Sequence, residues 1–221
     1  MSHLEYEIRQ LKSDIIEMWE LVQAQLVKTR EAIHLFDKDL AREVISNEKR
    51  VNSHELKIDR DCENIIALFN PVAIDLRFVL AVLKINSNLE RTGDIVESIS
   101  KFVLDVDKNF DKELLTITRL PEMLDIADNI LSDVFTAFNN DDTKLARSIF
   151  SRDEKLDEIN NAATKILAGY IKQHPENIHQ SLNVISIIRK LERIGDLCSN
   201  ISEEIIFFVE AKVLKHAKKK S

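Results

Sequence analysis

An internal repeat constrains this chain more than any other feature of its sequence. Residues 90–94 read Glu-Arg-Thr-Gly-Asp and residues 192–196 read Glu-Arg-Ile-Gly-Asp, an offset of 102 positions. The chain has three glycines, and two of them, Gly93 and Gly195, occupy the same place in this motif. A glycine inside a helix costs ~1 kcal/mol relative to alanine, so its presence in both copies requires a reason. The repeat predicts a duplicated helical unit that presents two copies of one carboxylate site.

The apolar pattern around the motif is repeated as well. Apolar side chains recur at spacings of three and four residues across 82–106, with Thr92 as the polar exception, and this pattern indicates one face of a helix. The offset of 102 places apolar residues at the equivalent positions across 184–208. An offset of 105 relates the preceding segments, pairing Leu40 with Leu145, Val44 with Ile149 and Val51 with Leu156. The repeat therefore extends over most of the chain.

Turn-forming residues are rare enough to predict an all-α fold. Three glycines and three prolines in 221 residues, with 44% apolar and 31% charged side chains, favour long amphipathic helices. Asn/Asp clusters and prolines predict six long helices, with ends near 37–39, 69, 106, 139–142 and 172, a polar connection up to Pro121, and a last helix introduced by Pro175. We expect two pseudo-symmetric antiparallel three-helix bundles, residues 1–112 and 113–221.

Charge and hydropathy exclude several classes of protein. The net charge of −7 argues against broad nucleic-acid binding, which needs a basic surface. No signal peptide is visible, and the longest apolar runs, 78–83 and 205–209, are far shorter than the roughly 20 residues of a spanning helix. Cys62 and Cys198 lack any framework spacing, which is typical of a reducing compartment. We expect a soluble, cytoplasmic protein. Its basic carboxyl end, Lys215 to Lys220, is typical of a solvated helix end, with weak membrane-surface contact as the alternative.

The repeated motif places carboxylates together on one side of a helix. If Leu89 and Val96 face the core, Glu90, Asp94 and Glu97 lie on the opposite, surface side. Like charges at this spacing destabilise a helix by about 0.2 to 0.5 kcal/mol, and a bound cation offsets the repulsion. Carboxylates are hard oxygen ligands that suit iron, manganese, magnesium or calcium, and zinc also accepts them.

The expected second and fifth helices supply matching polar pairs. Asp153 and Asp157 form an acidic pair on the fifth helix, and Glu48 and Asn52 occupy the equivalent positions on the second. Because the motif glycines have no side chain, they let a neighbouring helix approach closely, which brings facing acidic rows within reach of one metal cluster. An acidic row can equally be a solvated face, and the residues alone leave that alternative open.

Several stretches of the chain resemble the PhoU family of phosphate-regulatory proteins. The stretches are Glu-Arg-x-Gly-Asp in both halves, Pro-Val-Ala-Ile-Asp-Leu-Arg-Phe at 71–78 and Asn-Ile-Ser-Glu-Glu-Ile at 200–205. The resemblance covers nearly the whole chain and implies paired three-helix bundles whose acidic motifs bind multinuclear iron or zinc clusters at the surface. On this resemblance the metal ligands are Glu90, Asp94, Asp153, Asp157, Glu192, Asp196 and, with Asn52 rather than an acid as its partner, Glu48.

The same resemblance implies a regulator and not an enzyme. Proteins of this kind restrain phosphate uptake and phosphate-regulon signalling. Their partners would be the ATPase subunit of a Pst-type phosphate ABC transporter and a PhoR-type sensor histidine kinase. The resemblance also implies a homodimer, with membrane association at most peripheral and through the transporter, and no nucleic acid as a partner.

Two other hypotheses fit parts of the sequence. Glu31–His34 and Glu176–His179 have the Glu-x-x-His spacing of ferritin-like di-iron proteins, but each lies at a helix end, where no buried site is expected. The second alternative is a metal-free helical adaptor, in which Arg91 and Arg193 pair with acids on neighbouring helices and the glycines merely ease packing. No glycine-rich loop or nucleophile elbow indicates catalysis.

Overall fold

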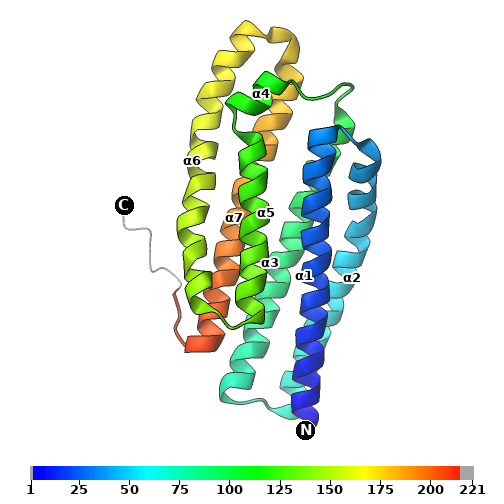
Figure 1. Cartoon of the computed structure of the whole chain (residues 1–221). Coiled ribbons are helices and arrows are strands. Elements are labelled where there is room, and N and C mark those ends of the chain that lie inside the picture. The colour runs from blue at the N-terminus through cyan, green and yellow to red at the C-terminus, as the bar shows by residue number, and fades with distance from the viewer. Residues whose placement is uncertain (1, 215–221) are drawn as a thin grey trace.

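The chain folds into two bundles of long helices that lie side by side (Figure 1). The computed structural model describes residues 2–214. In chain order these residues form α1 (His3–Leu35), α2 (Lys38–Phe69), α3 (Ala73–Asp105), α4 (Lys112–Ile117), α5 (Leu120–Asn139), α6 (Thr143–Gln173), the 3-10 turn η1 (Pro175–Asn177) and α7 (Ile178–Glu210). Residues 2–214 contain helices and no strand, so the predicted all-α class is confirmed.

One bundle consists of α1, α2 and α3, and the other consists of α5, α6 and α7. Successive long helices within each bundle run antiparallel, and the two bundles pack against each other mainly along α3 and α7 (Figure 1). α3 and α7 are the helices that carry the repeated motif. The predicted pair of three-helix bundles is therefore confirmed, and it places the two copies of the motif on adjacent helices at the centre of the molecule.

Matching residues begin the matching helices of the two bundles. The Asp37 side chain accepts hydrogen bonds from the backbone of Asp39 and Leu40 at the start of α2. Asp142 accepts the equivalent bonds, from Lys144 and Leu145, at the start of α6. A carboxylate at this position satisfies backbone N–H groups that have no partner within the helix and interacts favourably with the helix dipole. The repeat thus fixes helix boundaries as well as the core.

The connection between the bundles differs from the sequence prediction. Residues 107–120 were expected to be a polar connection, but they include the short helix α4. Asp111 caps it by accepting a 2.9 Å hydrogen bond from the backbone of Leu114, whose side chain is fully buried. This helix of six residues is too short to show a periodic pattern in the sequence. The last long helix is likewise preceded by the turn η1.

Aromatic side chains from four helices fill the space where the bundles meet. Trp19 on α1 lies 5.6 Å, between ring centroids, from both Phe135 and Phe138 on α5. Phe78 on α3 and Phe208 on α7 contact Phe138 at 6.2 and 6.0 Å. Burial of these large apolar rings favours packing of the two bundles against each other.

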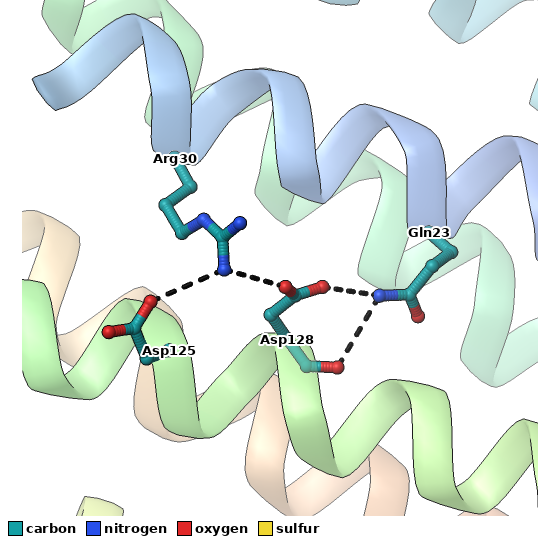
Figure 2. A network of polar contacts seen from close by, with 4 residues as sticks. All are labelled: Gln23, Arg30, Asp125 and Asp128. Carbon is teal, nitrogen blue, oxygen red and sulfur yellow. Dashed lines mark hydrogen bonds and ion pairs between the residues drawn. The ribbon is translucent and has the colours of Figure 1, made fainter. Parts of the chain in front are cut away.

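A polar network joins α1 to α5 at the edge of the same interface. Arg30 forms ion pairs with Asp128 (2.8 Å) and Asp125 (3.2 Å), and Gln23 donates a hydrogen bond to the Asp128 carboxylate (Figure 2). Burial raises the pKa of Asp128, and the Arg30 charge and the Gln23 hydrogen bond oppose that rise. The network sets the orientation of α1 against α5 rather than adding much stability, because partly exposed ion pairs contribute about 0 to 1 kcal/mol.

No helix in the described range combines the length and the apolarity that crossing a membrane requires. The basic carboxyl-terminal cluster that the sequence singled out, Lys215 to Lys220, lies outside the described residues.

Candidate carboxylate site

The motif glycines lie where side chains of a neighbouring helix pack directly against the backbone. A Cβ atom added to Gly93 would lie 3.2 Å from Val51 Cγ1 and 3.5 Å from Glu48 Oε2 on α2. At Gly195 an added Cβ would lie 2.6 Å from a Leu156 methyl carbon on α6 and closer still to the carboxylate of Asp153. The reason for both glycines is therefore steric: each leaves room for one carboxylate and one apolar side chain of the facing helix.

The carboxylates that face the two motif glycines occupy equivalent positions in the repeat. Glu48 and Asp153 are related by the offset of 105, and each lies against a motif glycine. Both are buried, with exposed fractions of 8% and 5%. The sequence pattern predicted the surface position of the acids on α3 and the facing pairs on α2 and α6, but not the burial of Glu48 and Asp153. Each site is therefore a surface row of acids on α3 or α7 with a buried carboxylate of the facing helix behind it.

Glu48 is the most perturbed carboxyl group of the amino-terminal site. Burial raises its pKa from 4.5 to about 7, and the nearby charges of Asp94, Glu97 and Glu90 add to the rise. Neither of its carboxylate oxygens receives a hydrogen bond from an N–H or O–H group of the described chain. The Asp94 carboxyl group lies beside it and can share a proton with it, but two ionised carboxylates only repel each other.

The acidic row continues along α2 and α3. Burial raises the pKa of Glu90, and the neighbouring charges of Asp94 and Glu55 raise it further. The pKa of Glu55 is raised by burial and by the charges of Asp59 and Asp94. Glu97 is ion-paired with Lys101 at 2.7 Å. Four or more carboxyl groups thus influence one another here with little positive charge between them, which is the electrostatic environment that a bound cation relieves.

The carboxyl-terminal site has the same plan with different contacts. Ser199 on α7 donates a 2.9 Å hydrogen bond to Asp153 Oδ2. Burial, together with the Asp153 charge, raises the pKa of the Cys198 thiol, so this cysteine stays protonated. Asp157 and Glu192 are half-buried and Asp196 is exposed, and each of these three acids already interacts with another group.

The structure places the predicted ligands on two pairs of packed helices, α2 with α3 and α6 with α7. Glu48, Glu90 and Asp94 influence one another on the first pair. On the second pair, α6 carries Asp153 and Asp157, and α7 carries Glu192 and Asp196. Within residues 2–214 no three His, Cys, Asp or Glu side chains already converge on a common point with the geometry of a metal site.

Two residues of α2, Glu48 and Glu55, matter more to the site than the sequence pattern indicates. Glu48 was the least secure of the expected ligands because its partner is Asn52, yet its buried carboxylate is the one left without a donor. Glu55 also lies on α2, and the charges of Asp59 and Asp94 raise its pKa, so it belongs to the same electrostatic group. Sequence spacing could place both on α2 but could not show which face α2 turns toward Gly93.

The other constellations do not form sites. Glu31 and His34 are exposed near the end of α1. Glu176 lies in η1, before the last helix, and His179 is exposed and forms an ion pair with Asp105 at 3.1 Å. The ferritin-like hypothesis requires both pairs in the core, and they are not there. Arg91 and Arg193 make no ion pair with any residue in 2–214, contrary to what the adaptor hypothesis expects of them.

The same family of known proteins matches each half of the chain. A family model described as the PhoU domain matches residues 15–103 and again residues 120–205. The chain belongs to the PhoU family. It is 33% identical over 210 residues to the phosphate-specific transport system accessory protein PhoU of Edwardsiella tarda, covering 95% of this chain and 86% of that protein.

Solved structures of PhoU proteins have the same fold. The crystal structure of PhoU from Pseudomonas aeruginosa aligns with a TM-score of 0.90 at 27% identity, over 95% of this chain and 100% of that one. The phosphate transport system regulatory protein PhoU from Streptococcus pneumoniae aligns with a TM-score of 0.85 at 27% identity, over 96% and 99%. Both likenesses extend across the two bundles.

Proposed function

We propose that this protein is a non-enzymatic negative regulator of phosphate uptake and of phosphate-dependent gene expression. Its membership of the PhoU family supports this role, since the Edwardsiella tarda relative is named an accessory protein of the phosphate-specific transport system and the Streptococcus pneumoniae protein a regulatory one. It acts by contact with the ATPase subunit of a phosphate ABC transporter and with a sensor histidine kinase. It works in the cytoplasm, as a homodimer.

The proposal includes metal binding at the two carboxylate sites. Glu48, Glu90 and Asp94 would hold a metal in the first site, and Asp153, Asp157, Glu192 and Asp196 in the second. The single observation that best supports binding is the buried Glu48 carboxylate, which has no hydrogen-bond donor and lies among other acids. Iron or zinc in these sites would supply positive charge that neutralises the rows. Unlike a general base or nucleophile, this role requires no substrate pocket beside the carboxylates.

Metal binding gives the acidic rows a regulatory function. Without a cation, ionised carboxylates along α2 and α3 repel one another and any acidic partner surface. With the rows neutralised, the side chains of α3 and α7 are ordered and the surface can dock on a partner. The two helices that carry the repeated motif, α3 and α7, pack against each other at the centre of the molecule.

A pair of variants tests whether metal and docking are coupled. Asp94→Ala with Asp196→Ala should reduce both metal content and binding to the purified transporter ATPase subunit. As a matched control, Asp125→Ala changes an exposed acid of α5 and should alter neither. Unchanged partner binding in a variant that has lost its metal would refute the docking role, and metal loss with the Asp125 control would show a nonspecific effect of charge.

A further inference from the structure

The turn between α2 and α3 exposes three large apolar side chains within seven residues. Leu68, in the last turn of α2, is 70% exposed, Val72 is 71% exposed, and Ile74, in the first turn of α3, is 57% exposed. Residues 64–74 contain no charged side chain. Soluble proteins rarely concentrate exposed apolar groups in this way, and such a patch marks a site of interaction with another surface.

This apolar turn projects past the second bundle (Figure 1). The Phe78 ring of α3 contacts Phe138 of α5 and Phe208 of α7, at 6.2 and 5.6 Å between ring centroids. The three rings are therefore level with one another, and α5 and α7 end within two residues of theirs. α3 begins five residues before Phe78, which places its start about 7 Å further out at 1.5 Å per residue.

Positive charge is concentrated at the same end of the molecule. α7 ends there at Glu210, and the next residues include Lys212 and Val213, both exposed. The sequence continues with a basic segment that contains Lys215, Lys218, Lys219 and Lys220. This segment lies outside the described residues, but the covalent chain keeps its lysines within roughly 20 Å of Leu214. In a protein of net charge −7, four lysines in six positions are a distinct local excess of positive charge.

We propose that the α2–α3 turn and the basic segment together bind the surface of an anionic lipid bilayer. Leu68, Val72 and Ile74 enter the interfacial layer, and the lysines lie against the anionic headgroups. Binding at a membrane surface increases with buried apolar area and with electrostatic attraction to anionic lipids, and this end of the molecule supplies both. The projection of about 7 Å matches the ~5–10 Å to which interfacial segments are buried. A bilayer accepts a convex apolar turn without the matching groove that a protein partner would need.

The inference goes beyond the proposed function and requires neither metal nor a protein partner. Glu90, the nearest proposed ligand on α3, is 17 residues along the helix from Ala73, about 25 Å from the turn. Direct lipid contact would hold the protein at the membrane surface before it meets a transporter.

Sedimentation of the full chain with protein-free vesicles tests the apolar part of the contact. The parent protein should bind vesicles of phosphatidylglycerol and phosphatidylcholine in equal amounts. Leu68→Ser with Val72→Ser should weaken this binding at least about tenfold, because transfer of one such side chain from water contributes roughly that factor. The matched control, Leu35→Ser with Leu182→Ser, changes side chains that are 71% and 55% exposed at the opposite end of the molecule. It should change the affinity by less than about twofold, as expected for exposed positions outside the contact.

A second pair of variants tests the basic segment. Replacement of three of its lysines by glutamine should weaken binding to the anionic vesicles at least about tenfold, because each lysine near an anionic surface contributes about a fivefold factor. Binding to phosphatidylcholine alone should be weak for the parent and unchanged by the replacement. The variant is Lys218→Gln, Lys219→Gln and Lys220→Gln, and its control, on exposed lysines of α6, is Lys155→Gln, Lys165→Gln and Lys172→Gln.

Four sedimentation results would overturn the proposal. They are no binding of the parent protein to anionic vesicles, equal weakening by a variant and its control, binding by metal-loaded but not chelated protein, and binding only to vesicles that contain the phosphate transporter. The last result would assign the turn to a protein partner and leave the proposed function intact. A lower molar mass of the Leu68→Ser/Val72→Ser variant in light scattering would instead assign the turn to a second copy of the chain. Because both side chains are exposed, this variant should melt with the parent, so loss of binding cannot be ascribed to unfolding.

Discussion

Glu48→Gln should stabilise the metal-free protein at alkaline pH and leave its stability unchanged at acidic pH. Folding raises the pKa of Glu48 from 4.5 to about 7. A raised carboxyl pKa means that the native state holds a proton that the unfolded chain has released, so stability falls as pH rises from about 4.5 to 7 and stays low above it. Glutamine keeps the shape of the protonated side chain and removes this loss.

The size of the effect follows from the shift. A change from 4.5 to about 7 corresponds to at most about 3 kcal/mol at pH 8, and we expect roughly 2 kcal/mol because part of the acidic row is open to solvent. For a chain of this length that is about 4 to 8 °C in melting temperature. At pH 5 the unfolded chain has already released part of this proton, so the gain should shrink to about 0.5 kcal/mol.

Urea unfolding of chelated protein at pH 5 and pH 8, followed by circular dichroism, measures this difference. Glu63→Gln changes an exposed acid of the same helix and should show no comparable gain at pH 8. After iron or zinc is added, the order should reverse, since the parent protein gains metal-dependent stability that the variant lacks. A Glu48→Gln variant that is less stable than the parent at pH 8 without metal would refute the assignment of Glu48 as a strained, unpartnered carboxylate.

Three further predictions use the repeat and the interface. Gly195→Ala should lower the free energy of unfolding by about 1 to 3 kcal/mol, because its Cβ would overlap α6 side chains, whereas Gly93→Ala, with looser contacts, should change it by less than about 1; urea titration measures both. Asp37→Ala and Asp142→Ala should each cost about 1 kcal/mol, equal within error, because they remove equivalent helix caps; unequal losses in thermal melts would contradict the equivalence. Trp19→Ala should cost about 3 to 5 kcal/mol, measured by chemical denaturation, and a loss under 1 would show that the aromatic cluster does not hold the bundles together.

The sequence predicts the helices and their pairing well because both depend on local patterns. The apolar periodicity of α3 and α7, the acids that cap α2 and α6, and the repeated glycines are all read along one chain segment. The sequence does not predict α4, because six residues are too few to show a periodic pattern. The stability of α4 depends on burial of Leu114, which is a tertiary contact.

The sequence predicts which residues belong to the candidate site, but it does not predict their burial or their pKa values. Spacing alone places Glu90 and Asp94 on one face of α3 and pairs Glu48 with Asp153. It cannot show that Glu48 is buried without a donor, because that depends on the approach of α2 to Gly93.

Metal content per chain, measured by plasma mass spectrometry on untagged protein beside the Asp94→Ala/Asp196→Ala variant, tests the central claim most directly. The account predicts iron or zinc bound to the parent protein and little bound to the variant, with recovery of metal by the chelated parent on reconstitution. Parent protein that contains no metal and takes up none on reconstitution would contradict it, and would leave the acidic rows as solvated faces of a helical adaptor.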